Sequence, residues 1–361
     1  MSHRVYNFNP GPSTLPVSVL QKAQAELLNY NNTGMSIMEL SHRSKDFEAI
    51  IEQAESKIKS LLQLTDDYRV LFLQGGASTQ FSMIPLNFLN DGQEANYVVT
   101  GAFADKALKE AALIGKTHIA ASSKDQNHNY IPSMEDIQLS NNPAYLHITT
   151  NNTIFGTQFK QFPEFDNIPL IADMSSDILS KSIDANKFSL IYAGAQKNLG
   201  PSGVTVVALR NSLIEASNQS LPTMSRYDIM AKNDSLYNTP PTFSIYLLNL
   251  VLDWIQGQGG ITELECHNQE KASYIYKAID DSNGFYKGHA LPEFRSDMNI
   301  TFTLANADLE QAFIAAAAER NIIGIKGHRS VGGMRASVYN AMEKAGCLAL
   351  AEFMKEFQKN H

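Results

Sequence analysis

The stretch IPLIADMSSDILSKSIDANKFSLIYAGAQKNLGPSGVTVVALR (168–210) decides the fold. It contains three short apolar runs, at residues 168–173, 189–194 and 204–210. Continuous apolar runs of this length are typical of strands buried on both faces, as in a parallel sheet covered by helices. Upstream, similar runs occur as RVLFL (69–73), NYVVTG (96–101) and YLHITT (145–150), with helical stretches between them. Strands that alternate with helices predict an α/β fold.

The flanking sequence predicts how this sheet is covered and where a second domain lies. Helical spacing links Val19, Ala23, Leu27 and Tyr30, and an apolar face of a second helix spans 47–62. The Leu-rich stretch FSIYLLNLVLDWIQ (243–256) predicts a helix closed by glycines, in which Trp254 serves packing. Beyond it, helices and two short strands (298–304 and 335–339) form an α+β pattern. We therefore expect a large domain at 16–258 and a small one comprising the Pro-rich arm 1–15 and residues 259–361.

Composition limits the classes of function. The chain has 361 residues, enough for roughly two domains, and a formal net charge of −8, which argues against a nucleic-acid partner. Cys266 and Cys347 have no zinc-ligand spacing around them, so no metal site is expected. No apolar run approaches the roughly 20 residues that span a bilayer, and the N-terminus has no signal-type apolar segment. We expect a cytoplasmic protein without membrane partners.

Three predicted strand ends carry reactive or ligand-binding groups. The run 69–73 is followed by Gln74-Gly75-Gly76-Ala77-Ser78-Thr79, the run 168–172 by Asp173, and the run 189–195 by Gln196-Lys197. Taken alone, each group has an ordinary structural interpretation: a tight turn, a helix cap and a solvated loop lysine. Together they match the three handles of pyridoxal phosphate (PLP): a helix N-terminus for its phosphate, a carboxylate for its pyridine nitrogen and an amine for its aldehyde. The turn is not GxGxxG, so a dinucleotide site is only weakly supported.

At this point the chain resembles the phosphoserine aminotransferases, a family of class V, fold type I PLP enzymes. The resemblance runs from end to end, and its most specific segments are AGAQKNLGPSG (193–203), with KGHR (326–329) and GMRAS (333–337). Further segments are NFNPGP (7–12), MSIMELSHRSKDF (35–47), VLFLQGGASTQF (70–81), ADMSSDILS (172–180) and YNTPPTF (237–243). It implies the PLP fold type I architecture, with a mainly parallel sheet in the large domain and a smaller α+β C-terminal domain.

The resemblance also implies residue roles. Lys197 matches the lysine that forms the Schiff base with PLP, and Asp173 matches its partner at the pyridine nitrogen. The other cofactor-binding positions would be Ala77 and Ser78 at the phosphate turn, Phe103 stacked on the ring, Thr153, Gln196, and Asn238 with Thr239 from a second subunit. Substrate phosphate and α-carboxylate would be bound by His42, Arg43, His328, Arg329 and Arg335. Arg335 suits a bidentate grip on a carboxylate. A homodimer with shared active sites follows from the same resemblance.

Two positions depart from the family pattern. Many relatives have Gly-Arg where this chain has Ala77-Ser78, so one cation of the pocket is missing. Many have a tryptophan where this chain has Phe103, which stacks with less area and has no N–H. These departures leave the cofactor chemistry intact and bear on selectivity for a phosphorylated substrate.

The implied reaction converts 3-phosphohydroxypyruvate and glutamate into phosphoserine and 2-oxoglutarate, in serine biosynthesis. A second substrate in vitamin B6 synthesis, a phosphorylated hydroxythreonine, is also implied. The alternatives are another class V enzyme, such as an alanine-type aminotransferase or a cysteine desulfurase, and a cofactor-binding protein without turnover. Cys266 falls in a predicted helix and Cys347 near the start of the last helix, so neither suits the mobile nucleophile that a desulfurase needs.

Overall fold

A seven-stranded sheet forms the centre of the computed structural model, which describes residues 4–329 and 331–361. The strand order is β2-β8-β7-β6-β5-β3-β4. Five neighbouring strands, β7, β6, β5, β3 and β4, run parallel, and β8 is antiparallel to both of its neighbours. The sheet is therefore mainly parallel, as predicted. Its strands are β2 (Tyr68–Leu73), β3 (Glu94–Val99), β4 (Thr117–Ser122), β5 (Pro143–Thr149), β6 (Leu170–Asp173), β7 (Leu190–Gly194) and β8 (Thr205–Arg210).

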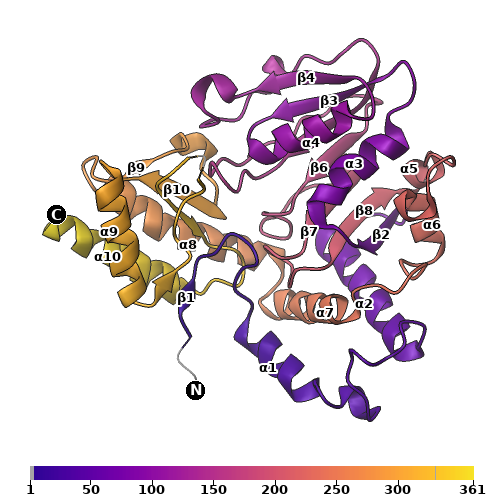
Figure 1. The fold of residues 1–361 in the computed structure, drawn as a ribbon, viewed down its shortest axis with the longest axis horizontal. Coiled ribbons are helices and arrows are strands. Elements are labelled where there is room, and N and C mark those ends of the chain that lie inside the picture. Colours follow the sequence, from indigo (N-terminus) through magenta and orange to yellow (C-terminus); the bar gives the residue numbers. More distant parts are fainter. Residues whose placement is uncertain (1–3, 330) are drawn as a thin grey trace.

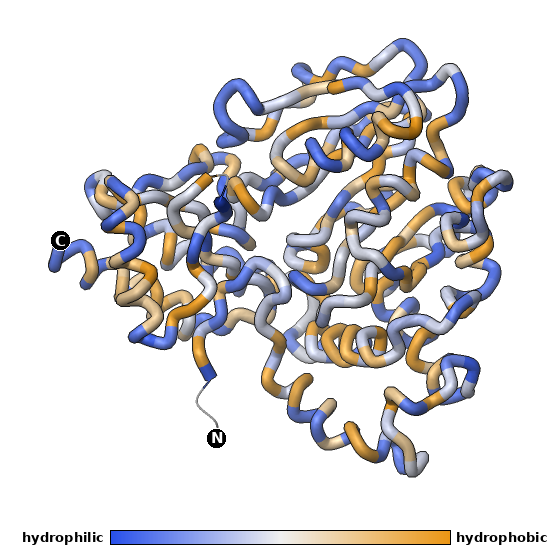
Figure 2. Tube along the Cα trace, in the orientation of Figure 1, coloured by the Kyte–Doolittle hydropathy of each residue, from blue (hydrophilic) through white to orange (hydrophobic). Residues whose placement is uncertain are grey.

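Helices cover both faces of this sheet (Figure 1). One hydrophobic cluster joins one face to α1 (Val17–Glu26), α2 (Lys45–Leu62) and α7 (Thr242–Gly257). A second cluster joins the other face to α3 (Gly76–Phe88), α4 (Ala102–Ala112), α5 (Asn211–Glu215) and α6 (Tyr227–Lys232). Figure 2 shows α7 as an almost continuous apolar segment, because it is covered by its neighbours on more than one side. Trp254 packs against the first cluster, as predicted for a packing residue.

The C-terminal elements gather beside the sheet around a cluster of their own (Figure 1). Strands β12, β10 and β9 form a three-stranded antiparallel sheet, and β1 of the N-terminal arm pairs with β11. Phe8 of the arm is fully buried in this cluster. The elements are β1 (Tyr6–Asn7), α8 (Ile261–Asp280), β9 (Lys287–Gly288), β10 (Asn299–Thr303), α9 (Ala307–Glu319), β11 (Ile322–Ile323), β12 (Met334–Ser337) and α10 (Lys344–Asn360).

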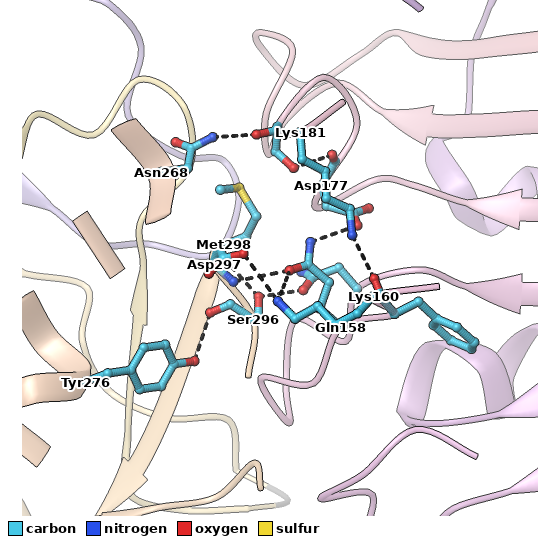
Figure 3. Close-up of polar contacts among 12 residues, drawn as sticks. Gln158, Lys160, Asp177, Lys181, Asn268, Tyr276, Ser296, Asp297 and Met298 are labelled. Carbon is cyan, nitrogen blue, oxygen red and sulfur yellow. Dashed lines mark hydrogen bonds and ion pairs between the residues drawn. The ribbon is translucent and has the colours of Figure 1, made fainter. Parts of the chain in front are cut away.

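Polar contacts join the sheet to the C-terminal elements just before β10 (Figure 3). Gln158 donates from Nε2 to the Asp177 carboxylate over 3.1 Å, and its Oε1 accepts from the Asp297 backbone N–H at 3.3 Å. Lys160 Nζ lies 3.3 Å from Asp297 Oδ2. Gln158 and Asp177 are buried, so these bonds also satisfy groups that water does not reach. These contacts fix β10, and with it β12, relative to the carboxyl ends of the parallel strands.

Two local expectations were incomplete. The helical spacing that links Tyr30 to the first helix is wrong for this residue, because α1 ends at Glu26. Tyr30 instead starts a short 3-10 turn that contains Asn31 and Asn32 with positive φ, because asparagine tolerates this conformation and favours turns. The edge strand β4 had no sequence prediction, and its Ile119 is 53% exposed. In the part of the chain that the structure describes, no helix is long and apolar enough to cross a membrane.

Candidate active site

The turn between β2 and α3 presents a helix N-terminus at the sheet's edge. Gly75 caps α3 with φ +87°, and a Cβ there would lie 1.8 Å from Thr79 Oγ1, so only glycine fits. The first N–H groups of a helix have no partner inside it and lie at the positive end of the helix dipole. Ala77 and Ser78 lie in this first turn. The turn is thus built to receive an anion, such as a phosphate.

A pocket of about 340 Å³ opens in front of this turn. Besides the glycines of the turn, its walls come from the ends of β6 and β7, the start of α4, the loop after β5 and the segment around β12. Nine residues predicted from the sequence line it: Ala77, Ser78, Phe103, Thr153, Asp173, Gln196, Lys197, His328 and Arg335. Residues separated by more than 250 positions in the chain therefore meet in one cavity.

Lys197 lies three residues beyond β7, and its Nζ donates to Thr153 Oγ1 over 2.7 Å. Burial lowers the pKa of its ammonium to about 8, with the carboxylate of Asp173 opposing the shift and the guanidinium of Arg335 adding to it. A lysine with this pKa has a substantial neutral fraction near neutral pH, unlike an ordinary lysine. Lys197 is thus suited to act as a nucleophile and as a carrier of protons.

Asp173 is the last residue of β6, and its side chain is only 4% exposed. Burial raises the pKa of this carboxyl, while the charge of Lys197 and hydrogen bonding by Ser175 and Tyr192 lower it. The backbone N–H of Ser175 donates to Asp173 Oδ1 over 2.9 Å. A carboxylate held in this way retains an oxygen for a cationic ligand, because a carboxylate accepts several hydrogen bonds.

Arg335, on β12, is a buried cation with few partners. It is 7% exposed, and its Nη1 lies 3.5 Å from the Thr153 carbonyl. Within the described residues its Nε has no hydrogen-bond partner and no carboxylate pairs with it. A buried, poorly paired guanidinium is costly unless a ligand completes it. A substrate carboxylate would do so, with two parallel hydrogen bonds.

Phe103, in the first turn of α4, contacts two lysines. Lys197 Nζ lies 4.7 Å from the ring centroid and Lys106 Nζ lies 5.2 Å from it. Burial lowers the pKa of His328, and the charges of Arg335, Arg329 and Lys106 lower it further. Sequence reasoning missed Lys106, whose helical spacing of three from Phe103 was the only available signal. Lys106 therefore adds a positive charge near the pocket that the residues predicted from the sequence did not include.

The N-terminal arm closes one side of the pocket. Ser13 donates from its backbone N–H to the Gln196 carbonyl over 3.0 Å, and its hydroxyl donates to the Lys197 carbonyl. Gly11 packs against the same segment, where a Cβ would lie 3.0 Å from Lys197 Cγ. With φ +137°, this position favours glycine for its backbone as well. The arm thus helps to fix the lysine backbone.

Other predicted site residues are not among those that line this pocket. His42 and Arg43 precede α2, and His42 has a buried Nε2 without a partner in the described residues. Asn238 lies beside a neighbouring cavity that shares Gly75 with the turn, and the Thr239 carbonyl accepts from Gln74 Nε2 at 3.3 Å. Arg329 is exposed next to His328. Their predicted roles require a second subunit or a bound ligand, and they stay predictions.

A cysteine in the pocket or a cluster of metal ligands would indicate a different chemistry. Cys266 is exposed on α8, and Cys347 is buried on α10, where burial raises its thiol pKa to about 12. Neither cysteine is among the described residues that line the pocket. Across residues 4–329 and 331–361, no group of three His, Cys, Asp or Glu side chains could hold a metal ion.

The residues of this pocket fit PLP. The free helix N-terminus of α3 suits its phosphate, and buried Asp173 suits a protonated ring nitrogen. Phe103 offers an aromatic face, and Lys197 offers an amine of lowered pKa. Each of these groups lines the same cavity, which still leaves Arg335 for the substrate.

Comparison with known proteins agrees with this geometry. The model of the aminotransferase class-V family matches residues 5–350. A phosphoserine aminotransferase of Geobacillus kaustophilus is 59% identical over 356 residues, covering 99% of each chain. The solved structure of the phosphoserine aminotransferase from Bacillus circulans subsp. alkalophilus has a TM-score of 0.98 at 56% identity, covering 99% of each chain. A second solved phosphoserine aminotransferase, described for radiation damage of its Schiff base, has the same TM-score and identity over 100% of both chains.

Proposed function

This chain belongs to the phosphoserine aminotransferases of the class V aminotransferase family, and from that membership we propose its substrates and residue roles. It is a PLP-dependent transaminase. We propose that it transfers the amino group between glutamate and 3-phosphohydroxypyruvate, giving 2-oxoglutarate and phosphoserine. The single observation that carries this proposal is the shared pocket of Lys197, Asp173 and Arg335 in front of the α3 N-terminus. One amino-acid substrate and PLP would use the anion site at this helix N-terminus, the amine of Lys197, the carboxylate of Asp173 and the guanidinium of Arg335.

The cofactor would be held by its three handles. Lys197 would hold the aldehyde, Asp173 the ring nitrogen, and the N–H groups at Ala77 and Ser78 the phosphate. Gln196 would contact the phosphate, and Thr153 would lie near the ring hydroxyl. When bound, PLP supplies the carbonyl that takes up the amino group and the electron-withdrawing ring that stabilises charge at the α-carbon.

Lys197 would then act as the general base and acid. Its pKa near 8 lets Nζ take the proton from the substrate α-carbon and hold it for return. Thr153, which accepts from Nζ at 2.7 Å, keeps that amine in place. Arg335 would hold the α-carboxylate by a bidentate contact and fix the α-carbon for proton transfer.

Selectivity for a phosphorylated side chain would rest on cations. Arg329 and Lys106 would supply the positive charge, and His328, whose pKa is lowered by burial and by these cations, would line the pocket as a neutral imidazole. A substrate dianion placed beside them would be attracted more strongly than a monoanion. Because Ser78 carries no charge, these groups would supply the attraction that an arginine in the turn provides in many relatives. The γ-carboxylate of glutamate would use the same site.

A homodimer would complete the pocket. His42, Arg43, Asn238 and Thr239 do not line the pocket of their own chain. We propose that a second copy supplies them, Asn238 and Thr239 at the cofactor phosphate and His42 and Arg43 at the substrate phosphate.

The domain division and the compartment are also proposals. Residues 16–258 would form the large domain, supported by the two clusters that flank the sheet. Residues 1–15 and 259–361 would form the small domain, supported by the separate cluster around Phe8 and α8. A cytoplasmic location is supported by the two cysteines, which are unpaired as in a reducing compartment.

Half-reaction absorbance measurements test the proposed function. Purified enzyme with bound PLP is mixed separately with phosphoserine, glutamate, serine and alanine, and the loss of the visible cofactor band is followed. We expect rapid loss with phosphoserine and glutamate and at least tenfold lower efficiency with serine and alanine, because charged hydrogen bonds contribute about 1.5–3 kcal/mol each. Equal efficiency with alanine would instead favour a general class V aminotransferase.

A further inference from the structure

Three buried asparagines bind one short segment, residues 178–180, which continues the chain beyond Asp173. Each asparagine donates from Nδ2 to one backbone carbonyl of this segment: Asn198 to Ile178 over 2.6 Å, Asn340 to Leu179 over 2.9 Å and Asn268 to Ser180 over 2.9 Å. Figure 3 shows the side chain of Asn268, on α8, directed at this segment. All three asparagines are at most 6% exposed. Successive carbonyls are therefore satisfied by side chains from three different parts of the chain.

Leu179 has a backbone conformation that leucine rarely adopts. Its φ of +56° lies in the left-handed region, where the Cβ of an L-residue comes close to a carbonyl oxygen. Such a conformation persists only where the surrounding structure fixes it. The hydrogen bond from Asn340 to its carbonyl, with those of the two other asparagines on either side, supplies this constraint. The asparagines thus hold the segment 178–180 in one shape.

Asn340 also lies on the chain that leaves β12, five residues beyond Arg335. Its backbone N–H donates to Asn198 Oδ1 over 2.9 Å, and Asn198 directly follows Lys197. Its own Oδ1 accepts from Asn268 Nδ2 at 2.8 Å. Both polar atoms of the Asn340 side chain and its backbone N–H therefore have partners in other segments.

These contacts join the continuations of the three strands that hold the groups of the pocket. Strands β6 and β7 pair directly in one sheet, so their ladder fixes Asp173 and Lys197 relative to each other. Arg335 lies on β12, which belongs to a different sheet. Its position relative to Lys197 therefore depends on contacts between the two sheets and their connections. Asn340 makes such contacts both to the segment after β6 and to the segment after β7.

We propose that Asn340 is a positioning residue for the transaminase reaction. Its bonds to Leu179 and Asn198 hold the end of β12 against the segments that leave β6 and β7. They thereby set the distance between the Arg335 guanidinium, which would hold the substrate α-carboxylate, and Lys197 Nζ, which would take the α-proton. The inference rests on the proposed function, because that function assigns these tasks to the arginine and the lysine.

The variants separate positioning from general destabilisation. Asn340→Ala removes both side-chain hydrogen bonds of this residue. Asn96→Ala is the matched control, because Asn96 is also fully buried, its Oδ1 accepts from the Ser140 N–H at 2.8 Å and its Nδ2 donates to the Glu94 carbonyl over 2.9 Å. Those bonds do not involve the segments that leave β6, β7 or β12. Asn268→Ala is a milder second variant, which removes the donor to Asn340 Oδ1 and leaves the other bonds of Asn340 in place.

The decisive readout is the rate constant of a single half-reaction. Each PLP-bound variant is mixed with excess phosphoserine or glutamate, carrying hydrogen or deuterium at the α-carbon, and the loss of the visible cofactor band is followed. For Asn340→Ala we expect a saturating rate constant about tenfold or more lower with both amino acids, because proton transfer requires close alignment of the reacting atoms. The half-saturating concentration should change less, and the deuterium isotope effect should be at least that of the wild type. A merely structural loss lowers the amplitude and leaves the rate constant unchanged.

A second readout uses the apoenzyme. Hydrogen–deuterium exchange, followed by mass analysis of peptides, should become faster over residues 334–340 in Asn340→Ala and stay unchanged in β6 and β7, whose ladder is intact. Attachment of PLP to Lys197 should keep its wild-type pH midpoint, because the contact between Lys197 Nζ and Thr153 does not involve Asn340.

A double variant tests whether Asn340 acts through Arg335. Once Arg335→Ala has removed the guanidinium, its placement no longer matters, so adding Asn340→Ala should not lower the rate constant further, whereas independent effects add. The proposal is overturned if Asn340→Ala keeps the wild-type rate constant, if its isotope effect shrinks, if Asn96→Ala slows the reaction equally, or if the two changes add.

Two further outcomes are assigned in advance. If Asn340→Ala cannot be obtained with bound PLP, Asn268→Ala is judged by the same criteria, with a smaller change expected in the same direction. If the wild-type enzyme reacts with phosphoserine no faster than with alanine, the proposed function is wrong. Alanine also carries an α-carboxylate, so the comparison of variants can then be made with alanine and decides the role of Asn340 separately.

Discussion

Lys197 Nζ donates to the hydroxyl of Thr153 over 2.7 Å, and this contact joins the end of β7 to the loop that follows β5. The amine is therefore fixed before any ligand binds. In the same pocket Arg335 reaches the carbonyl of Thr153. One residue thus contacts both the group expected to carry the proton and the group expected to hold the substrate.

The first prediction is that PLP attaches to Lys197 and to no other lysine. Lys197→Ala should bind PLP without a covalent bond and should not turn over. Borohydride reduction followed by peptide mass analysis measures the attachment. Lys271 provides an internal control, because burial also lowers its pKa to about 8. Its Nζ donates to the carbonyls of Val338 and Tyr339, at 3.1 and 2.8 Å, so it should stay unmodified. A reduced adduct on Lys271 would refute the assignment.

The second prediction concerns pH. The ammonium of Lys197 has a lowered pKa near 8, so its neutral, reactive form is lost as pH falls below that value. Covalent attachment of PLP to the apoenzyme should therefore be half-maximal near pH 8, well below the value for an ordinary lysine. The Asp173 charge raises this pKa, so Asp173→Asn should move the midpoint to lower pH. The growth of the visible band after mixing measures both. A midpoint that rises in Asp173→Asn would contradict the electrostatic account.

The third prediction separates activity from folding at Asp173. Burial raises the pKa of this carboxyl above its ordinary value, so at neutral pH its charge costs folding free energy in the apoenzyme. Asp173→Asn should therefore leave the melting temperature of the apoenzyme equal or higher. It should nevertheless lower turnover by at least a hundredfold, since breaking a buried charge pair costs about 3–5 kcal/mol. Calorimetry of the apo and PLP-bound forms, with steady-state rates, tests this. Near-normal turnover in Asp173→Asn would contradict a role for Asp173 in the reaction.

The sequence alone predicts the strand that ends in Asp173 and the strand that ends three residues before Lys197, because each lies in a buried apolar run that leads into a polar residue. Strand β4 is not predicted, because an edge strand with exposed Ile119 lacks a continuous apolar run. Tyr192 lies within the run 189–194, whose apolar pattern predicts a buried strand. Its place beside Asp173 depends on the register between β6 and β7, which no local pattern contains.

The fourth prediction tests the shared active site by mixing subunits. Lys197→Ala should inactivate its own pocket, whereas Arg43→Ala should impair the pocket of the partner subunit. A hybrid dimer then contains one pocket with both defects and one with neither. Co-expressing the two variants with different purification tags should therefore restore activity to about half of the wild-type value per dimer. If Arg43 instead serves its own chain, the hybrid stays impaired in both pockets and no activity returns.

The last prediction divides the substrate's anionic groups between two arginines. Arg335 is buried in the pocket, whereas Arg329 is exposed beside His328 and acts on the charge state of that histidine. We expect Arg335→Ala to lower kcat/KM alike for phosphoserine and glutamate, because both carry an α-carboxylate. Arg329→Ala should lower it by about ten- to a hundredfold for phosphoserine and by less for glutamate, because a phosphate carries more charge than a carboxylate. Arg320→Ala, which removes an exposed arginine paired with Glu356 across α9 and α10, controls for the loss of surface charge. Ser78 supplies no charge at the turn, so the loss of Arg329 cannot be offset there. Equal losses for the two substrates in Arg329→Ala would show that this arginine does not distinguish phosphate from carboxylate.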